Sequence, residues 1–371
     1  MKIAIPTETQ VGESRVAASP DTVKAYVKKG AEVWVQAGAG KGASISDEAF
    51  AAAGAKITPD SFGDPDVVLT VRRPSEQLLN SLKPGAILMG GLEPYGDRAG
   101  LEAIARSGAV AFAMELMPRI TRAQSMDILS SQANLAGYKA VIDAAFHFTR
   151  AFPMMMTAAG TVPAAKVFIM GVGVAGLQAI ATARRLGAIV SATDVRKATE
   201  EQVKSLGAKF VYADIADAAT SGGYAKELSA EDKAKQAALV AEHVKGQDVV
   251  ITTALIPGRP APVLITQEMV ESMKPGSIII DLAVERGGNC PLSKPDQIVE
   301  HKGVRIVGTV NLAGKLAGNA SPLFAKNLAN FLDLMIQKDG TLKIDDADEC
   351  IKGTMIARDG ALVHPMFQGA K

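Results

Sequence analysis

The sequence predicts an α/β protein with parallel sheets, built as two domains with a cleft between them. First, a chain of 371 residues exceeds what one hydrophobic core usually holds, so two domains are expected. Second, apolar runs of strand length alternate with helix-like stretches from the first residue onward, which is typical of parallel-sheet proteins. Third, this alternation occurs in two series, separated by one long helix-like segment at residues 126–150.

The first series contains five expected strands, with helices such as residues 20–29 between them. These strands are residues 2–6, 32–36, 67–71, 86–89 and 109–114. A further helix is expected at residues 321–336, where it would return the chain to the first domain. We therefore expect a discontinuous first domain of residues 1–133 plus 318–371 and a second domain of residues 134–317.

The second series contains six expected strands joined by helix-like stretches. They are residues 166–170, 189–194, 209–212, 248–253, 277–282 and 304–307. This succession is typical of a complete Rossmann unit. The prediction is thus two Rossmann-like domains, of which the second has the more complete pattern.

Composition limits the class of partner and the compartment. Lysine and arginine (40) nearly balance aspartate and glutamate (39), so no basic field attracts nucleic acid or an anionic membrane. Cys290 and Cys350 lie far apart without metal-ligand spacing, which fits buried thiols in a reducing cytosol. The uncharged stretch 167–183 contains glycines and is shorter than the roughly 20 residues of a spanning helix. We expect a soluble, cytoplasmic protein that reaches a membrane only through a partner.

The strongest motif is the glycine-rich segment Gly171-Val172-Gly173-Val174-Ala175-Gly176, which follows an expected strand and opens an expected helix. In a dinucleotide site the first glycine permits the tight turn and the second lets the backbone approach the pyrophosphate. The third allows close helix–strand packing, and the phosphates lie at the positive helix N-terminus. Val174 would lie beside the phosphates. The alternative is a glycine-rich turn with no ligand.

The cofactor choice depends on Asp194, at the end of the next expected strand. Its carboxylate can accept hydrogen bonds from the adenosine ribose hydroxyls and repel a 2′-phosphate, which favours NAD(H) over NADP(H). Val195 and Arg196 follow directly. The Arg196 guanidinium could instead pair with a phosphate, stack on adenine or face solvent.

A polar cluster of Arg119, Gln124, Asp127 and Ser130 follows the last expected strand of the first series. Gln124 offers an amide to a ribose hydroxyl and Asp127 can accept from a carboxamide, while Arg119 and Ser130 can orient that carboxylate. The alternative is a helix N-terminus with local salt bridges.

Other segments carry weaker signals. Residues 38–42 lack a Walker glycine and the Ser or Thr after Lys41, so a tight turn is expected there. The run 154–156, three methionines beside Phe152 and Pro153, is expected to fill the core. Residues 212–236 form a long connection with few apolar anchors, either a functional lid or a disordered excursion. None of the four histidines ends an expected strand, so an acid–base residue for an ordinary dehydrogenase is lacking: His147, His243, His301 and His364.

These segments carry a family resemblance along essentially the whole chain. Residues 5–8, 13–17 and 35–42 resemble the signature shared by alanine dehydrogenases and transhydrogenase α chains. Residues 118–137 are similar to the Arg, Gln, Asp, Ser loop of the transhydrogenase NAD(H)-binding component. This loop separates the two families.

The resemblance implies roles for individual residues. Gln124 contacts the nicotinamide ribose, and Asp127, steered by Arg119 and Ser130, positions the nicotinamide carboxamide. The resemblance also implies that Gly223 and Tyr224 lie on a mobile loop that closes over NAD(H), with Gln236 just beyond it, Leu255 near the nucleotide and Asn311 near the nicotinamide. The nucleotide-binding residues expected from the motif itself are Gly171, Gly173, Val174, Gly176, Asp194, Val195 and Arg196.

Departures from alanine dehydrogenase lie at its substrate positions. Arg15 is kept, but Arg72 stands at the substrate lysine position, and Glu93 and Glu285 stand at the catalytic histidine and aspartate positions. The resemblance therefore implies a dimeric NAD(H)-binding component that passes hydride to an NADP(H)-binding component, with proton translocation in a membrane-spanning component. The alternatives are an alanine dehydrogenase-like amino-acid dehydrogenase and a noncatalytic NAD(H)-binding regulatory or scaffold protein.

Overall fold

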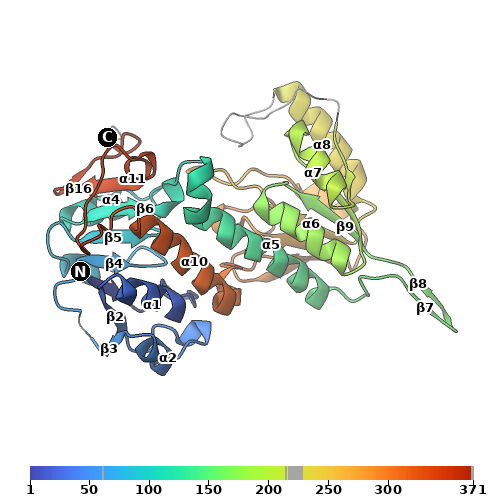
Figure 1. Ribbon diagram of the computed structural model, residues 1–371. Coiled ribbons are helices and arrows are strands. Elements are labelled where there is room, and N and C mark those ends of the chain that lie inside the picture. Colours follow the sequence, from blue (N-terminus) through green and yellow to red (C-terminus); the bar gives the residue numbers. More distant parts are fainter. Residues whose placement is uncertain (61, 214, 216–228, 369–371) are drawn as a thin grey trace. The chain divides into compact units, whose positions relative to one another are not determined.

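The computed structural model describes residues 1–60, 62–213, 215 and 229–368 and forms two compact units (Figure 1). Unit 1 comprises Met1–Gln132 and Ala313–Lys371, and unit 2 comprises Ala133–Leu312. The domain boundaries expected from the sequence lie after residues 133 and 317. That the chain divides there into independently folding domains remains a prediction.

Unit 1 is built on an eight-stranded, mostly parallel sheet in the order β17-β16-β6-β5-β4-β1-β2-β3. Strands β1 to β6 run parallel in the Rossmann order β3-β2-β1-β4-β5-β6, and β16 and β17 extend the β6 edge in antiparallel fashion. The strands are β1 (Lys2–Ile5), β2 (Glu32–Gln36), β3 (Lys56–Thr58), β4 (Val67–Leu69), β5 (Ile87–Gly90), β6 (Val110–Ala113), β16 (Met355–Arg358) and β17 (Ala361–Leu362).

Alternate residues of these strands enter two separate cores, because successive side chains of a strand point to opposite faces. On β1, Ile3 and Ile5 join one core while Ala4 joins the other. Both faces of the sheet are therefore covered, as parallel sheets require. The helices of this unit are α1 (Pro20–Lys28), α2 (Asp47–Ala52), α3 (Glu76–Asn80), α4 (Arg98–Arg106), α10 (Ala317–Leu332) and α11 (Glu349–Thr354).

Unit 2 contains a seven-stranded sheet in the order β11-β10-β9-β12-β13-β15-β14. The first six of these strands run parallel in the Rossmann order, and β14 pairs antiparallel at the edge. The strands are β9 (Lys166–Met170), β10 (Ile189–Thr193), β11 (Lys209–Phe210), β12 (Val249–Thr252), β13 (Ile278–Asp281), β14 (Ile298–His301) and β15 (Val304–Val307). The helices are α6 (Val174–Arg185), α7 (Glu200–Ser205), α8 (Ala230–Val244) and α9 (Gln267–Ser272), with α5 (Ile128–His147) starting in the last residues of unit 1.

The predicted α/β class is confirmed, with a strand at every expected position. The expected helices 126–150 and 321–336 are α5 and α10. The antiparallel edge strands β14, β16 and β17 and the short β3 were not expected, because short edge strands lack a long apolar run. Among the described residues no helix combines the length and apolarity that crossing a membrane requires. Cys290 and Cys350 are buried free thiols, as predicted.

The expectation that residues 154–156 fill the core is wrong. Met154 and Met156 are 61% and 80% exposed. They begin a hairpin of β7 (Met155–Thr157) and β8 (Gly160–Val162), a two-stranded sheet of its own that extends away from the helices and sheet of unit 2 (Figure 1). An apolar run alone does not show whether another element covers it.

Candidate nucleotide-binding site

The carboxyl edge of the unit 2 sheet has a topological switch point between β9 and β12. From β9 the chain proceeds to β10 on one side and returns to β12 on the other. At such a switch point the connections that leave the two strands turn to opposite faces of the sheet, and α/β sheets bind ligands at these strand ends. The glycine-rich segment is the loop that leaves β9.

Each of the three glycines meets a different steric demand. Gly171 has φ +98°, a left-handed conformation that disfavours other residues. A Cβ atom at Gly176 would lie 1.9 Å from the carbonyl oxygen of Gly171, so only glycine lets α6 pack this closely on the loop. A Cβ atom at Gly173 would meet no atom within 4 Å. Gly171 and Gly176 are thus needed by the fold, whereas space is open at Gly173.

The N-terminus of α6 faces this open space without a capping side chain. Gly173 is the N-cap residue and makes no side-chain hydrogen bond to the helix. Val174, the first helical residue, is 39% exposed. The first amides of a helix have no partners within it, and together with the helix dipole they favour an anion. This end of α6 is suited to a pyrophosphate.

Asp194 follows β10 and holds the glycine loop in place. Its buried Oδ2 accepts a hydrogen bond from the amide of Val172 at 2.8 Å. Arg196 donates Nε to Oδ1 and Nη2 to Oδ2 of the same carboxylate, at 2.8 and 2.7 Å. Arg196 Nη2 also donates to the carbonyl of Val172 at 3.2 Å. The half-buried Val195 lies between the two.

The remaining expected nucleotide-binding residues have distinct surroundings. Gln236, on α8, is buried and donates to Thr193 Oγ1 at 2.7 Å, while its Oε1 accepts from the amide of Ala213 at 3.2 Å. Leu255, three residues beyond β12, is 49% exposed. Gly223 and Tyr224 lie outside the described residues. The structure thus brings the glycine loop and Asp194 together, and fastens Gln236 to the end of β10.

In unit 1 the expected polar cluster lies across the start of α5. Asp127 accepts the amide of Ser130 at 3.0 Å and its hydroxyl at 2.5 Å, so it caps the helix. Gln124 is exposed in the preceding 3₁₀ helix, Thr121–Met126, and Arg119 is exposed before it. The structure therefore brings Asp127 and Ser130 into contact and leaves the Gln124 side chain accessible.

A second group of charged residues, at the switch point of unit 1, was only partly identified from the sequence. Glu13 pairs with Arg15 at 2.6 Å and with Arg72 at 2.9 Å, and Arg72 also pairs with Glu93 at 3.2 Å. Glu8 accepts the amides of Val71 and Arg72, at 2.6 and 3.1 Å. Glu8 thus links the loops that follow β1 and β4. Its position just after a strand was the signal that could have identified it.

Burial and charge move the pKa values of this group in opposite directions. Burial raises the pKa of Glu8 to about 7, against the lowering effect of its two amide donors. Burial would also raise the pKa of Glu13, but hydrogen bonds and charge from Arg15, with Arg72, outweigh it and lower the pKa to about 2. Both arginines therefore pair with an ionised carboxylate of the protein itself.

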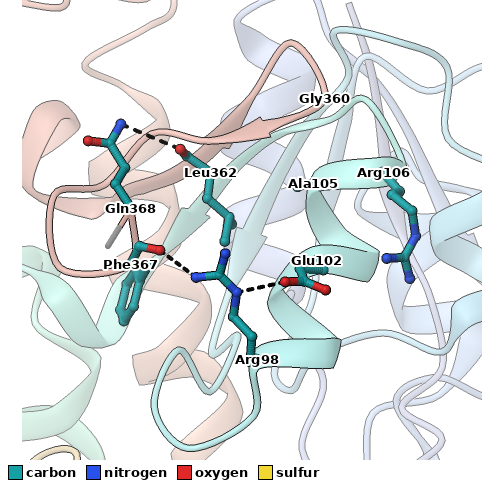
Figure 2. Close-up of a pocket in the computed structure, with 8 residues that line it drawn as sticks. All are labelled: Arg98, Glu102, Ala105, Arg106, Gly360, Leu362, Phe367 and Gln368. Carbon is teal, nitrogen blue, oxygen red and sulfur yellow. Dashed lines mark hydrogen bonds and ion pairs between the residues drawn. The ribbon is translucent and has the colours of Figure 1, made fainter. Parts of the chain in front are cut away.

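A separate cavity of about 300 Å³ lies in unit 1, between α4 and the end of the chain (Figure 2). Arg98 crosses it, donating to the Phe367 carbonyl at 2.5 Å and to Glu102 at 2.7 Å. None of the residues expected to bind nucleotide lines it. Its lining residues are Arg98, Glu102, Ala105, Arg106, Gly360, Leu362, Phe367 and Gln368.

Two family models together match nearly the whole chain. The model described as "Alanine dehydrogenase/PNT, N-terminal domain" matches residues 4–136, and "Alanine dehydrogenase/PNT, C-terminal domain" matches residues 140–365. The chain belongs to the alanine dehydrogenase/PNT family. The resemblance identified from the sequence is confirmed.

Relatives within the alanine dehydrogenase/PNT family carry two kinds of name. A protein of Rhodospirillum rubrum, named as the first part of an NAD(P) transhydrogenase subunit alpha, is 58% identical, covering 100% of this chain and 99% of the relative. A protein of the same name from Rickettsia prowazekii is 48% identical, covering 98% of this chain and 96% of the relative. An alanine dehydrogenase of Mycobacterium tuberculosis is 32% identical, covering 80% and 76%. The chain is thus a close relative of the transhydrogenase subunits and a distant one of that alanine dehydrogenase.

Solved structures in the alanine dehydrogenase/PNT family agree with this fold. The transhydrogenase of Sinorhizobium meliloti matches with a TM-score of 0.90 and 54% identity, covering 98% of this chain and 100% of that one. An L-alanine dehydrogenase matches with a TM-score of 0.82 at 24% identity, covering 99% and 98%, which shows the shared fold alone.

Proposed function

We propose that this chain is the soluble NAD(H)-binding component of a proton-translocating transhydrogenase and exchanges hydride between NADH and NADP+ held on a partner component. The observation that best supports this proposal is the open, uncapped N-terminus of α6 at the unit 2 switch point, with Asp194 beside it. The nicotinamide ring of NADH, when bound, supplies the hydride. The protein's task is to bind and orient this ring.

The residues present fit NAD(H) better than NADP(H). In this proposal the Asp194 carboxylate accepts hydrogen bonds from the ribose hydroxyls and disfavours a 2′-phosphate. Arg196, the nearest cation in the sequence, donates to Asp194 through two of its nitrogens. A guanidinium engaged in this way is poorly placed to receive a phosphate, which supports NAD(H).

Charge at the unit 1 switch point supports hydride exchange over amino-acid oxidation. Arg15 and Arg72 stand where the resemblance implies substrate-binding residues, but Glu13 already pairs with both. Glu93 stands at the implied histidine position and pairs with Arg72. A carboxylate substrate would have to displace these ion pairs. Exchange between two nicotinamides needs no proton donor, since hydride moves alone.

The exposed loop of unit 1 is proposed to hold the nicotinamide end of the cofactor. Gln124 would bind the ribose and Asp127 the carboxamide, with Arg119 and Ser130 orienting Asp127. The short hydrogen bond from Ser130 fixes one oxygen of Asp127 and supports this role. Its support from sequence is the likeness of residues 118–137 to the transhydrogenase loop.

The proposed partners are an NADP(H)-binding component, a membrane-spanning component and a second copy of this chain. The words "subunit alpha" in the names of the relatives imply further subunits. The exposed methionines of the β7–β8 hairpin offer an apolar surface for a homodimer. We place the protein in the cytoplasm, held at the inner membrane through its partners. If a Met156→Glu variant sediments like wild type, the hairpin is not part of this interface.

Parallel assays of NADH oxidation test the proposal against both alternatives. One assay contains pyruvate and ammonium, and the other contains NADP+ and a transhydrogenase NADP(H)-binding component. We expect oxidation only in the second. Oxidation in the first would make the chain an amino-acid dehydrogenase, as the name of the Mycobacterium tuberculosis relative would suggest. NADH binding without oxidation in either would indicate a noncatalytic binding protein.

A further inference from the structure

The loop that follows β12 starts beside the glycine loop, at the carboxyl edge of the unit 2 sheet. Its first residue, Thr253, donates its amide to the Met170 carbonyl at 2.9 Å and its hydroxyl to the Gly171 carbonyl at 3.0 Å. These bonds attach the start of the loop to the glycine loop. The residues that follow, 254–262, therefore begin next to the expected phosphate-binding segment.

This loop has little to hold its own shape. It contains no helix or strand, and its prolines at 257, 260 and 262 carry no amide hydrogen to donate. Leu255 and Ile256 are 49% and 42% exposed, so burial of these side chains does not anchor it either. Its position must depend on hydrogen bonds from elsewhere.

Asn289 provides three of these bonds from the loop that follows β13, and the carbonyl of Arg286 accepts the amide of Ala261 at 2.8 Å. The Asn289 side chain is fully buried; Oδ1 accepts the amide of Ala254 at 3.1 Å and Nδ2 donates to the Ala254 carbonyl at 2.9 Å. Nδ2 also donates to the Pro262 carbonyl at 2.7 Å. One side chain thus joins Ala254, near the start of the loop, to Pro262 at its end.

Asp281, at the end of β13, fixes Asn289 in turn. The fully buried carboxylate accepts the amides of Asn289 and Cys290, at 2.9 and 3.1 Å, and the hydroxyl of Ser293 at 2.6 Å. A buried carboxylate needs such donors to offset the loss of water. Asn289 is therefore attached to a rigid strand, and its amide orientation is set by partners on both sides.

We propose that Asn289 is a positioning residue of the nucleotide site. By joining Ala254 to Pro262, it holds the exposed Leu255 and Ile256 at the crevice, next to the glycine loop. This role rests on the proposed function only in that the ligand of the crevice is NAD(H). Loss of the Asn289 amide loosens the β12 loop at Ala254 and Pro262 and weakens nucleotide binding without removing any group that this proposal places against the nucleotide.

An Asn289→Ser variant tests this role against general destabilisation. The matched control is Ser277→Ala, which removes a buried hydroxyl donating to the Gln247 carbonyl at 3.2 Å, just before β13 and at the opposite edge of the same sheet. We expect the Kd for NADH to rise about tenfold in Asn289→Ser, which corresponds to a loss of about 1.4 kcal/mol of binding free energy. In Ser277→Ala the Kd should change less than about twofold, although its Tm also falls.

Hydrogen exchange identifies the cause. In Asn289→Ser the amide of Ala254 should exchange faster, while amides of β9 and β12 keep their protection. An unchanged Kd for NADH, with Ala254 exchanging faster, would show that the loop is released without consequence and would overturn the proposal.

Wild-type protein gives a second test in case Asn289→Ser does not fold. Adding NADH should slow exchange of the Ala254 amide, because a ligand in the crevice stabilises the Asn289-bound loop. NADH binding with no change at Ala254 would overturn the positioning role. Wild-type protein that does not bind NADH would instead refute the proposed function, so the two failures are distinguishable.

Discussion

Arg196 Nη2 lies 2.7 Å from Asp194 Oδ2, the oxygen that also accepts the amide of Val172. The Asp194 carboxylate therefore holds the glycine loop through the Val172 amide and also pairs with Arg196, two residues along the chain. Because burial of an unpaired carboxylate is costly, this pairing offsets the burial of the Asp194 side chain. Ribose hydroxyls must share these oxygens with Arg196.

Asp194→Ala is expected to weaken NADH binding by at least about tenfold, because hydrogen bonds to a charged group contribute about 1.5–3 kcal/mol. It should weaken NADPH binding less, since the repulsion of a 2′-phosphate is also lost. The Kd values of both nucleotides measure this.

Asp248→Ala is the matched control for that variant. Asp248 is also buried, accepts the amide of Lys166 at 2.8 Å and pairs with Arg150, but it lies at the opposite edge of the sheet. We expect lower stability with unchanged nucleotide preference. Similar losses of nucleotide affinity in both variants would show that Asp194 has no specific role in the nucleotide site.

Gly173→Ala and Gly176→Ala should separate binding from folding. The added methyl at Gly173 enters open space, so the Tm should stay near wild type while the Kd for NADH rises. The methyl at Gly176 collides with the Gly171 carbonyl, so the Tm should fall, with a cost of about 1–3 kcal/mol for overpacking. Thermal unfolding and NADH titration measure both. Unchanged NADH affinity in Gly173→Ala would argue that no ligand approaches there.

The sequence predicted those features of the site that depend on neighbouring residues. The glycine loop and the Asp127–Ser130 contact involve residues within one turn of a helix, so their spacing is diagnostic. The Asn289–Ala254 contact joins residues that are distant in the sequence, and no motif marks it. Residues 154–156 were misinterpreted for a related reason: composition does not show whether an apolar run is covered. For Arg196 the sequence left several roles open, and the structure places its guanidinium on Asp194.

Gln124→Asn should slow hydride transfer more than it weakens binding. Shortening an exposed amide by one methylene displaces its contact by about 1 Å, and such a displacement can cost up to about 100-fold in rate. The Kd for NADH should change less than about threefold, since few contacts are lost. Single-turnover hydride transfer and NADH titration measure the two quantities.

Arg122→Gln is the control for Gln124→Asn, because it lies in the same 3₁₀ helix. It breaks an exposed ion pair with Asp348 and should change neither quantity. Equal losses of rate and affinity in Gln124→Asn would exclude a positioning role for Gln124.

The raised pKa of Glu8 predicts a loss of stability as the pH rises from 4.5 to about 7. A carboxyl whose pKa is about 7 in the fold and 4.5 in the unfolded chain stabilises the fold fully below pH 4.5. That stability is lost as the pH rises through 7, by up to about 3 kcal/mol. Glu8→Gln should therefore gain stability relative to wild type between about pH 5 and about pH 8. Thermal unfolding across this range measures the difference, and a constant difference would contradict a raised pKa at Glu8.

Transfer of deuterium from NADH tests the central claim most directly. NADH with deuterium at both C4 positions is mixed with the chain, NADP+ and a transhydrogenase NADP(H)-binding component in ordinary water. The account predicts NADPH with one deuterium at C4 for each NADH oxidised, because hydride passes between the two nicotinamides without exchange with solvent. NADPH without deuterium, or no NADPH at all, would contradict the assignment of this chain as a direct hydride donor.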